Sequence, residues 1–230
     1  MELEIHEFQV SILRELLFKP KARFRDLKKV DTTNDHFSFH INKLVKIGLI
    51  IKEEGRYSLS IKGKEFANRL DTETLIFEKQ AKVTVALHAI RKRNKTTEYL
   101  IHQRLKEPFY SWFGSHSGKV KWGENPLEAA KREFLEETGL TGSFTHKGIT
   151  HVIHKHEDGR LLEDKYFWSY LIENTKGKFI KEVEEGKNLW VTEKEYRKIK
   201  NKFATFDELE EVLGSKKLVY VEREWVVDSY

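Results

Sequence analysis

Apolar side chains recur at three- and four-residue steps over residues 3–18, and this spacing predicts an amphipathic helix with one buried stripe. The stripe consists of Ile5, Phe8, Ile12, Leu13 and Leu16. Pro20 follows and ends the helix. Two more helices are predicted over Phe24–Val30 and about Thr33–Ile47, and Gly48 supplies a left-handed turn after the second. The first fifty residues therefore predict three short helices.

The period then changes from helical to alternating. Residues 49–51 and 57–61 alternate around a charged turn that contains Gly55, which predicts a β-hairpin, and a further helix is expected through Phe66 and Leu70. Helix, helix, helix, hairpin and helix is the element order of a winged helix-turn-helix. We therefore expect a domain of this type over residues 1–75.

The segment FSFHINKLVKIGLI…EEGRYSLSIKGKEF resembles the recognition helix and wing of small ArsR- or MarR-like regulators. The resemblance implies duplex DNA as a partner. The side chains that it places at the DNA are Asn34, His36, Ser38 and Lys43 near the major groove, and Arg56 near a phosphate or the minor groove. Two such modules in a homodimer would match a two-fold operator, an arrangement that the sequence allows.

Charge supports a polyanionic partner for this domain. Between Lys19 and Arg69 there are 13 lysines and arginines against 6 acidic residues, a difference of +7, whereas the whole chain carries only +5. An ordinary solvated surface produces similar counts, and winged helices also serve protein contacts or bind RNA. Those alternatives stay open.

The second part of the chain mixes strands with helices. The predicted strands are Ala81–Arg91, Glu98–Leu105, Ser143–Lys155 and Leu161–Glu173. The predicted helices are Pro126–Thr138 and Glu193–Lys202. This mixture indicates an α/β or α+β sandwich.

Composition narrows the class of protein. The 230 residues include no cysteine, which excludes disulfides, thiolate metal sites and a cysteine nucleophile. No run approaches the ~18 apolar residues of a membrane span, and the opening residues lack the pattern of a signal peptide. We expect a cytoplasmic protein with no membrane partner, and any metal on carboxylates, histidines or backbone oxygens.

Residues 118–140 read GKVKWGENPLEAAKREFLEETGL, and a helix is locally specified within them. Asn125 is a good N-cap, Pro126 suits the first helical position, and Gly139 can close the helix. Three carboxylates at i, i+3 and i+4 share one face: Glu133, Glu136 and Glu137. Such a stripe is usually only solvated, and its like charges destabilise a helix by a few tenths of a kcal/mol per pair. A divalent cation would remove the repulsion, and oxygen ligands favour Mg²⁺ or Mn²⁺.

The same segment matches the pattern G-x5-E-x7-R-E-U-x-E-E-x-G-U, where U is apolar, at every position, and thus resembles the Nudix box. The fixed residues are Gly118, Glu124, Arg132, Glu133, Glu136, Glu137 and Gly139. The resemblance implies a fold of class α/β, with the winged helix-turn-helix followed by a Nudix α/β/α sandwich over residues 76–230. It also implies hydrolysis of a nucleoside diphosphate linked to another moiety, by attack of metal-activated water on the pyrophosphate.

The resemblance assigns a role to each residue of the box. The metal ligands would be Glu133, Glu136, Glu137 and a backbone carbonyl near Gly118. Glu133 or Glu137 would also take a proton from the attacking water. Arg132 would hold a glutamate, Glu124 first among the candidates, and so fix the loop against the helix.

Two features near the box remain open. Many relatives carry a further carboxylate shortly before a strand that ends in Trp-Val, and here Glu184 and Glu185 both precede Trp190. Many relatives also read G-x-P-G-G before the box, where this chain has Gly114-Ser115-His116-Ser117-Gly118. The histidines at positions 146, 151, 154 and 156 fit ordinary satisfied or exposed side chains better than metal ligands.

Two functions compete on these grounds. One is an active hydrolase whose winged helix locates it on DNA or regulates it. The other is a transcriptional regulator whose Nudix domain senses a nucleotide metabolite, and the complete set of box acids favours retained hydrolysis. Neither the particular substrate nor the operator follows from the sequence.

Overall fold

The computed structural model describes residues 5–77 and 79–227. The chain divides into two compact units, Met1–Lys79 and Gln80–Tyr230. The sequence placed this boundary a few residues earlier, between residues 75 and 76. Among the described residues, no helix combines the length and the apolar character needed to cross a bilayer.

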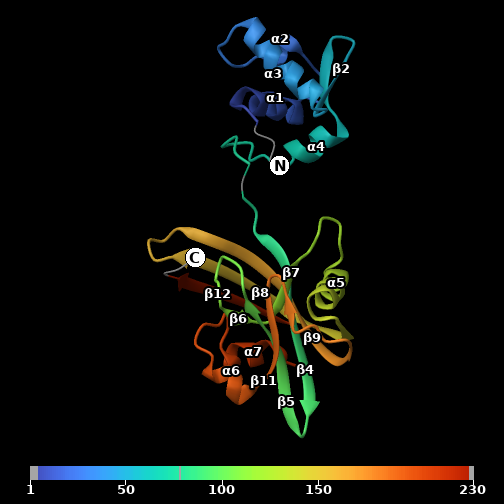
Figure 1. Ribbon diagram of the computed structural model, residues 1–230. Coiled ribbons are helices and arrows are strands. Elements are labelled where there is room, and N and C mark those ends of the chain that lie inside the picture. The colour runs from blue at the N-terminus through green and yellow to red at the C-terminus, as the bar shows by residue number, and fades with distance from the viewer. Residues whose placement is uncertain (1–4, 78, 228–230) are drawn as a thin grey trace. The chain divides into compact units, whose positions relative to one another are not determined.

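The N-terminal unit contains helices and short strands in the order α1 (Glu7–Phe18), β1 (Ala22–Arg23), α2 (Phe24–Leu27), α3 (Asn34–Lys46), β2 (Ile50–Glu53), β3 (Arg56–Leu59) and α4 (Ile61–Ala67). The strands form an antiparallel sheet in the order β1-β3-β2 (Figure 1). Glu54 and Gly55 connect β2 to β3 with φ angles of 49° and 73°, as a tight hairpin turn requires. The predicted hairpin is therefore present.

The apolar stripe predicted for the first helix contributes three residues to the core of this unit. Ile12, Leu13 and Leu16 of α1 pack with Phe37, Ile41 and Leu44 of α3, and all six are at most 2% exposed. Helix α3 begins where the Thr33 hydroxyl accepts a bond from the His36 amide at 3.3 Å. It ends just before Gly48, whose φ is 77°.

Some boundaries in this unit differ from the prediction. Helix α1 begins after the N-cap His6, and residues 3 and 4 of the predicted helix lie outside the described residues. Helix α2 stops at Leu27 because the backbone leaves the helical region at Lys28 (φ −77°, ψ 83°), after a single turn. Helix α4 ends at Ala67. Strand β1 was not predicted, since two residues are too few to show alternation.

The second unit contains β4 (Lys82–Arg93), β5 (Thr96–Arg104), β6 (Phe113–Gly114), β7 (His116–Lys119), α5 (Pro126–Thr138), β8 (Leu140–His156), β9 (Leu161–Gly177), β10 (Glu182–Val183), β11 (Gly186–Thr192), α6 (Glu193–Lys198), α7 (Phe206–Leu213) and β12 (Val219–Val227). Its sheet has the order β10-β11-β5-β4-β9-β8-β12, with β6 beside β5 and β7 beside β4. The β4–β9 and β8–β12 pairs are parallel, and the others are antiparallel.

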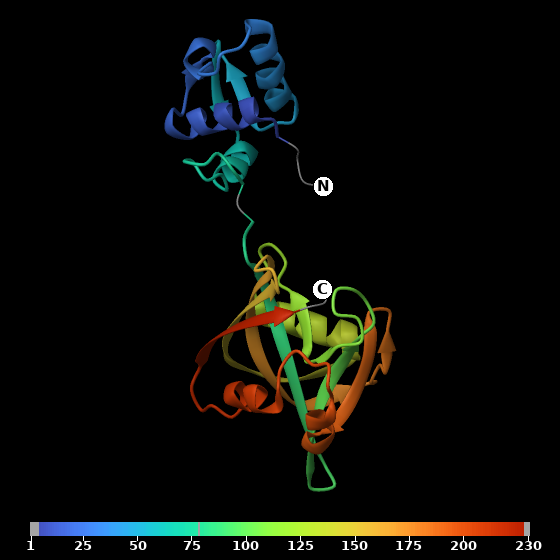
Figure 2. The same cartoon turned by 90° about the vertical axis from the view of Figure 1, so that its left-hand side faces the viewer.

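Alternation along the strands divides this unit into two cores. Val85 and Leu87 of β4 pack with Phe134 of α5 on one face of the sheet. On the other face, Ile101 of β5 packs with Leu209 of α7 and with α6. Figure 1 shows α5 on one side of the sheet and α6 and α7 on the other, and Figure 2 shows the same unit from the side of α6 and α7. The unit is thus a sheet between helices.

The predicted helix Pro126–Thr138 has the bounds of α5. Strands β8 and β9 are each 17 residues long; β8 extends beyond its predicted bounds at both ends, and β9 begins at the predicted Leu161 and extends beyond its predicted end. Helix α6 is shorter than predicted and ends at Lys198, where Ile199 adopts an extended conformation. Strands β6, β7, β10 and β12 and helix α7 had not been predicted.

Candidate active site

Helix α5 carries the three glutamates of the box, and local sequence specifies both of its ends. The Asn125 side chain accepts a hydrogen bond from the Leu127 amide at 2.9 Å, and Pro126 occupies the first helical position. Gly139 closes the helix with φ 70°, a left-handed conformation that other side chains strain. The register of the glutamates is therefore set by their own helix.

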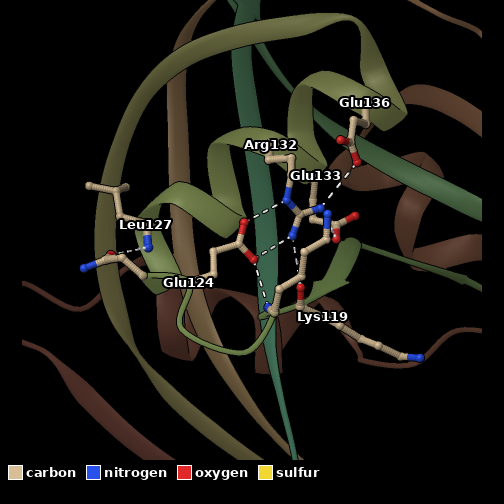
Figure 3. Close-up of polar contacts among 8 residues, drawn as sticks. Lys119, Glu124, Leu127, Arg132, Glu133 and Glu136 are labelled. Atoms are coloured by element: carbon tan, nitrogen blue, oxygen red, sulfur yellow. Dashed lines mark hydrogen bonds and ion pairs between the residues drawn. The ribbon is translucent and has the colours of Figure 1, made fainter. Parts of the chain in front are cut away.

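Arg132 binds Glu124 through two nitrogens of its guanidinium (Figure 3). Its Nε donates to Glu124 Oε1 and its Nη2 to Oε2, each at 2.8 Å. Glu124 also accepts the Lys121 amide at 2.9 Å. These bonds lower the pKa of Glu124 to about 2, so the carboxylate is charged at neutral pH. The contact that the resemblance implied is present, and it ties the loop before α5 to the helix.

The third guanidinium nitrogen of Arg132 contacts two carboxylates of the box. Nη1 donates to Glu133 Oε1 at 2.7 Å and lies 3.4 Å from Glu136 Oε2, while Nη2 also donates to the Lys119 carbonyl at 3.2 Å (Figure 3). The Glu133 side chain is 17% exposed and that of Glu136 is 59% exposed. Arg132 therefore joins α5 to β7 and offsets the repulsion between two of the three glutamates.

Gly118, in β7, lies against the side chain of Glu133. A β-carbon at position 118 would collide with the carboxylate end of Glu133. Any other residue at 118 would therefore displace this carboxylate. This contact explains, independently of the family pattern, why position 118 is a glycine.

Glu137 lies apart from this network and lines a cavity of about 230 Å³. Burial, followed by the nearby charges of Glu133 and Glu185, raises the pKa of Glu137 to about 8. Two of the box glutamates thus contact Arg132, and the third faces the cavity. The carboxylates are close enough to repel one another, which is the situation that a bound cation relieves.

Of the two carboxylates after the box, Glu185 lines the cavity together with Glu137. Glu185 also forms an ion pair with Lys106, and its backbone carbonyl accepts the Leu105 amide at 2.8 Å. Glu184 is exposed. The geometry therefore brings Glu185 to the box.

Sequence reasoning missed three polar residues beside Glu137. His102 of β5 and Asn188 of β11 face each other across the sheet, and their side chains bond at 3.0 Å. His116 of β7 bonds to the same amide oxygen at 2.8 Å. Among the described residues, one set of three side chains could hold a metal ion, because their donor atoms lie within 4.8 Å of one another. The set consists of His102, His116 and Glu137. These positions are far apart in sequence, so only the sheet reveals the cluster.

Comparison with known families agrees with this geometry. The family model described as the NUDIX domain matches residues 82–212, which is more than half of the chain. The chain belongs to the Nudix family. The prediction of an enzyme, a Nudix-type pyrophosphohydrolase acting on phosphoric anhydride bonds, is thereby confirmed.

Solved structures of Nudix proteins resemble the second unit. The MutT protein of Bacillus halodurans matches with a TM-score of 0.52 and 24% identity, over 65% of this chain and 93% of that one. The NUDIX domain of Shewanella oneidensis NrtR, solved with ADP ribose, matches with a TM-score of 0.49 and 14% identity over 65% and 93%. The MutT NUDIX hydrolase of Burkholderia pseudomallei matches with a TM-score of 0.46 and 25% identity, over 58% of this chain and 99% of that one. No curated protein sequence matches the chain. The first of these likenesses supports the Nudix fold.

The histidines of β8 lie beside ordinary polar groups of the Nudix unit. Their neighbours are the Gly148 carbonyl for His146, Asp164 for His151, Glu163 for His154 and Asp158 for His156. The interpretation as satisfied or exposed residues holds for His146, His151 and His156, whereas the buried Nδ1 of His154 has no hydrogen-bond partner among the described residues and lies 3.5 Å from Glu163 Oε2.

The residues expected at DNA lie in the N-terminal unit. Asn34, His36, Lys43 and Arg56 are exposed, and Ser38 is partly buried. Ser38 and Lys43 lie on the two flanks of the buried stripe of α3. His36 instead packs against α1, with its ring against Phe8 and its Nε2 3.1 Å from His40 Nε2. The free surface of α3 thus holds some of the expected residues but not all.

Proposed function

We propose that this Nudix enzyme uses Mg²⁺ or Mn²⁺ to cleave the pyrophosphate of a nucleoside diphosphate linked to another moiety. The observation that carries the proposal is the arrangement around α5. Arg132 holds Glu124 and Glu133, Gly118 leaves room for the Glu133 carboxylate, and Glu137 faces a cavity.

The donors around α5 fit a hard divalent cation. Glu133, Glu136 and Glu137 offer carboxylate oxygens, Gly118 offers a backbone carbonyl, and Glu185 supplies a further carboxylate in place of the alternative Glu184. Such an ion neutralises phosphate charge and lowers the pKa of water when it is bound. The close packing of Gly118 on Glu133, where a β-carbon would collide with the carboxylate, supports this assignment.

In the proposed reaction, the oxygen of a water molecule forms a bond to one phosphorus of the pyrophosphate. The bond from that phosphorus to the bridging oxygen breaks, and the bridging oxygen leaves with the second phosphate. Glu133 or Glu137 takes the proton of the attacking water. Arg132 and Glu124 act as positioning residues, because their bidentate contact keeps Glu133 over Gly118.

The cavity beside Glu137 suits a nucleotide. Its lining includes the basic side chains of Arg104 and Lys165 and the aromatic ring of Phe167. Basic groups complement phosphates, and an aromatic face can stack on a base. These features support a nucleotide-type substrate without selecting one.

A hydrolysis screen of the full chain tests this function. Nucleoside diphosphate sugars, dinucleotides and nucleoside triphosphates are incubated with Mg²⁺ or Mn²⁺, and the phosphate-containing products are separated. We expect turnover of at least one diphosphate-linked compound and its loss in excess EDTA. Undiminished turnover in EDTA, or none across the panel with metal present, contradicts the proposal.

We also propose that the N-terminal unit is a winged helix-turn-helix that binds duplex DNA. Its element order and its three-stranded β1-β3-β2 sheet support this assignment. Lys43 on α3 and Arg56 on the β2–β3 hairpin are exposed cations at the two places that such a module presents to DNA. Binding of fluorescent duplexes by the full chain should weaken as salt rises, and no salt-dependent binding of any duplex would favour a protein partner.

A regulator that senses a nucleotide is the second candidate, because one chain joins a complete Nudix box to a basic unit. If the two units are coupled, a nucleotide should change DNA affinity by about 5–150-fold, and DNA should change nucleotide affinity by the same factor. Both affinities can be measured in a variant that binds the nucleotide without cleaving it. If neither ligand changes the affinity for the other, the chain is an enzyme tethered to the N-terminal unit and not a sensor.

A further inference from the structure

A buried amide in the Nudix unit fixes the protonation of two histidines. Asn188 is 5% exposed, and its Nδ2 donates to the Glu137 carbonyl at 2.7 Å and to the Ile180 carbonyl at 2.9 Å. Because both amide hydrogens are used, Oδ1 must be the atom that faces His102 and His116. An amide oxygen only accepts hydrogen bonds, so each imidazole must donate to it.

The tautomers follow directly from these contacts. His102 bonds to Asn188 through Nδ1 and His116 through Nε2, so these two nitrogens carry the hydrogens. The lone pairs are then on His102 Nε2 and His116 Nδ1. A histidine whose second nitrogen donates to a fixed acceptor is the usual arrangement of a metal-binding imidazole.

The lone pair of His116 lacks a hydrogen-bond partner among the described residues. His116 is 1% exposed, and its Nδ1 is buried without a donor nearby. Leaving a buried acceptor unpaired costs about 1–3 kcal/mol. This cost is explained if the nitrogen has a ligand that is not part of the polypeptide.

The missing side chain of Gly186 leaves space beside the second lone pair. The Nε2–Cε1 edge of His102 lies over Gly186, where a β-carbon would collide with it. One nitrogen of each histidine and one carboxylate oxygen of Glu137 lie within 4.8 Å of one another. An ion at about 2.0–2.2 Å from each donor requires the donors to lie at most about 4.4 Å apart, slightly closer than in this cluster.

We propose that His102, His116 and Glu137 form a mixed nitrogen and oxygen site for a borderline divalent ion such as Co²⁺ or Zn²⁺. Imidazole nitrogen suits these ions, whereas Mg²⁺ prefers oxygen ligands. The site shares Glu137 with the proposed carboxylate site but includes donors from β5 and β7 that the box does not contain. It binds metal whether or not the chain hydrolyses pyrophosphates.

The test uses Co²⁺ and the full chain, because the ligand-field absorption of Co²⁺ reports nitrogen coordination without reference to activity. We expect saturable binding with an intense visible band in the wild type. His102→Gln and His116→Gln should each weaken Co²⁺ binding by about 100-fold or more and remove the band. Circular dichroism shows whether each variant is folded, and the partly buried His102 permits a decision if His116→Gln does not fold.

Another histidine pair in the chain requires a matched control. His36 and His40 of α3 have their Nε2 atoms 3.1 Å apart, so they could bind Co²⁺ independently. His36→Gln should leave the band unchanged. A band that disappears in His36→Gln, or that survives in both His102→Gln and His116→Gln, overturns the proposal.

A further variant separates this inference from the proposed function. Glu133→Gln should abolish Mg²⁺-dependent hydrolysis while the Co²⁺ band remains, because Glu133 is not a ligand of the histidine site. Complete displacement of Co²⁺ by an equal concentration of Mg²⁺ would show an oxygen-only site and contradict the histidine assignment. Absence of hydrolysis in the wild type with the band present would leave the histidine site intact and reject only the hydrolase.

Discussion

Helices α3 and α5 are built alike, yet only one of them has a chemistry that can be identified from its sequence. Each is 13 residues long, begins at a side-chain cap and is followed by a glycine in the left-handed region. Helix α5 presents Glu133 and Glu136 to one arginine, and Glu137 to a cavity. Helix α3 presents an open surface that includes Ser38 and Lys43.

The difference lies in what each chemistry demands of its residues. Catalysis on phosphates with a hard metal admits few residue types at fixed spacing, so Gly118, Arg132 and the glutamates form a specific pattern. Contact with a DNA backbone accepts lysine, arginine, serine, asparagine or a backbone amide at many positions. A helix is specified locally in both cases, but a function is specified only where substitution is not tolerated.

The largest expected effect concerns Glu137, the box carboxylate that faces the cavity. Glu137→Gln keeps the shape of the side chain and removes its charge. We expect hydrolysis to slow by about 10²–10⁴-fold, equivalent to about 3–5 kcal/mol of barrier, because metal and water lose a charged ligand. Steady-state kinetics with Mg²⁺ provide the measurement, and DNA binding should be unchanged.

Glu128→Gln is the matched control for this prediction. Glu128 lies on the same helix, its side chain is 62% exposed, and its partner is Lys131 at 2.9 Å. Turnover should remain at the wild-type rate. An equal loss of turnover in both variants would indicate a general effect on α5. Wild-type turnover by Glu137→Gln would show that the role assigned to this carboxylate is wrong.

The sequence predicted elements best where local signals were strong. The bounds of α5 followed from Asn125, Pro126 and Gly139, whose preferences depend only on the adjacent backbone. Helix α7 carried a comparable signal, with a Thr205 cap and a buried stripe that includes Leu209, and it was overlooked. Strands β6 and β10 are two residues long, and pairing across the sheet rather than local pattern creates them.

At the site, the sequence predicted the box residues on and beside α5 but not the side chains that the strands of the sheet contribute. The box placed Arg132 beside Glu124 because both belong to one local pattern. His102, His116 and Asn188 come from three strands, and their convergence depends on the register of β5 with β11. The choice of Glu185 over Glu184 likewise required the fold, since adjacent residues on a strand or turn point in different directions.

Truncating one core residue in each unit tests whether the units are independent. Phe37 of α3 and Phe134 of α5 are both 0% exposed, so Phe→Ala at either position should destabilise its own unit by about 3–5 kcal/mol. We expect Phe37→Ala to lower the denaturant midpoint of the N-terminal unit without changing hydrolysis, and Phe134→Ala to lower that of the Nudix unit. Loss of hydrolysis in Phe37→Ala would show that the enzyme depends on the N-terminal unit.

A smaller, pH-dependent effect is expected at Glu124. Arg132 holds the pKa of Glu124 at about 2 in the folded chain, below its ordinary value of 4.5. The stabilisation is therefore present above about pH 4.5 and is lost as the pH falls toward 2. Glu124→Gln should lower the denaturant midpoint of the Nudix unit at pH 7 and converge with the wild type in acid. A constant difference across this range would mean that the effect is packing and not charge.

The smallest expected effect is at the hairpin of the N-terminal unit and tests whether its chemistry is that of a DNA-binding module. Arg56 is exposed beside the Glu54–Gly55 turn. If it neutralises one phosphate, Arg56→Ala should reduce the slope of log affinity against log salt by about 0.9 and weaken binding similarly for all duplex sequences. Fluorescence anisotropy over a salt series measures this slope. Lys79→Ala, outside the predicted recognition helix and wing, is the matched charge control and should leave the slope unchanged. Equal slopes for wild type and Arg56→Ala would remove the hairpin from the DNA interface and leave α3 as its remaining candidate.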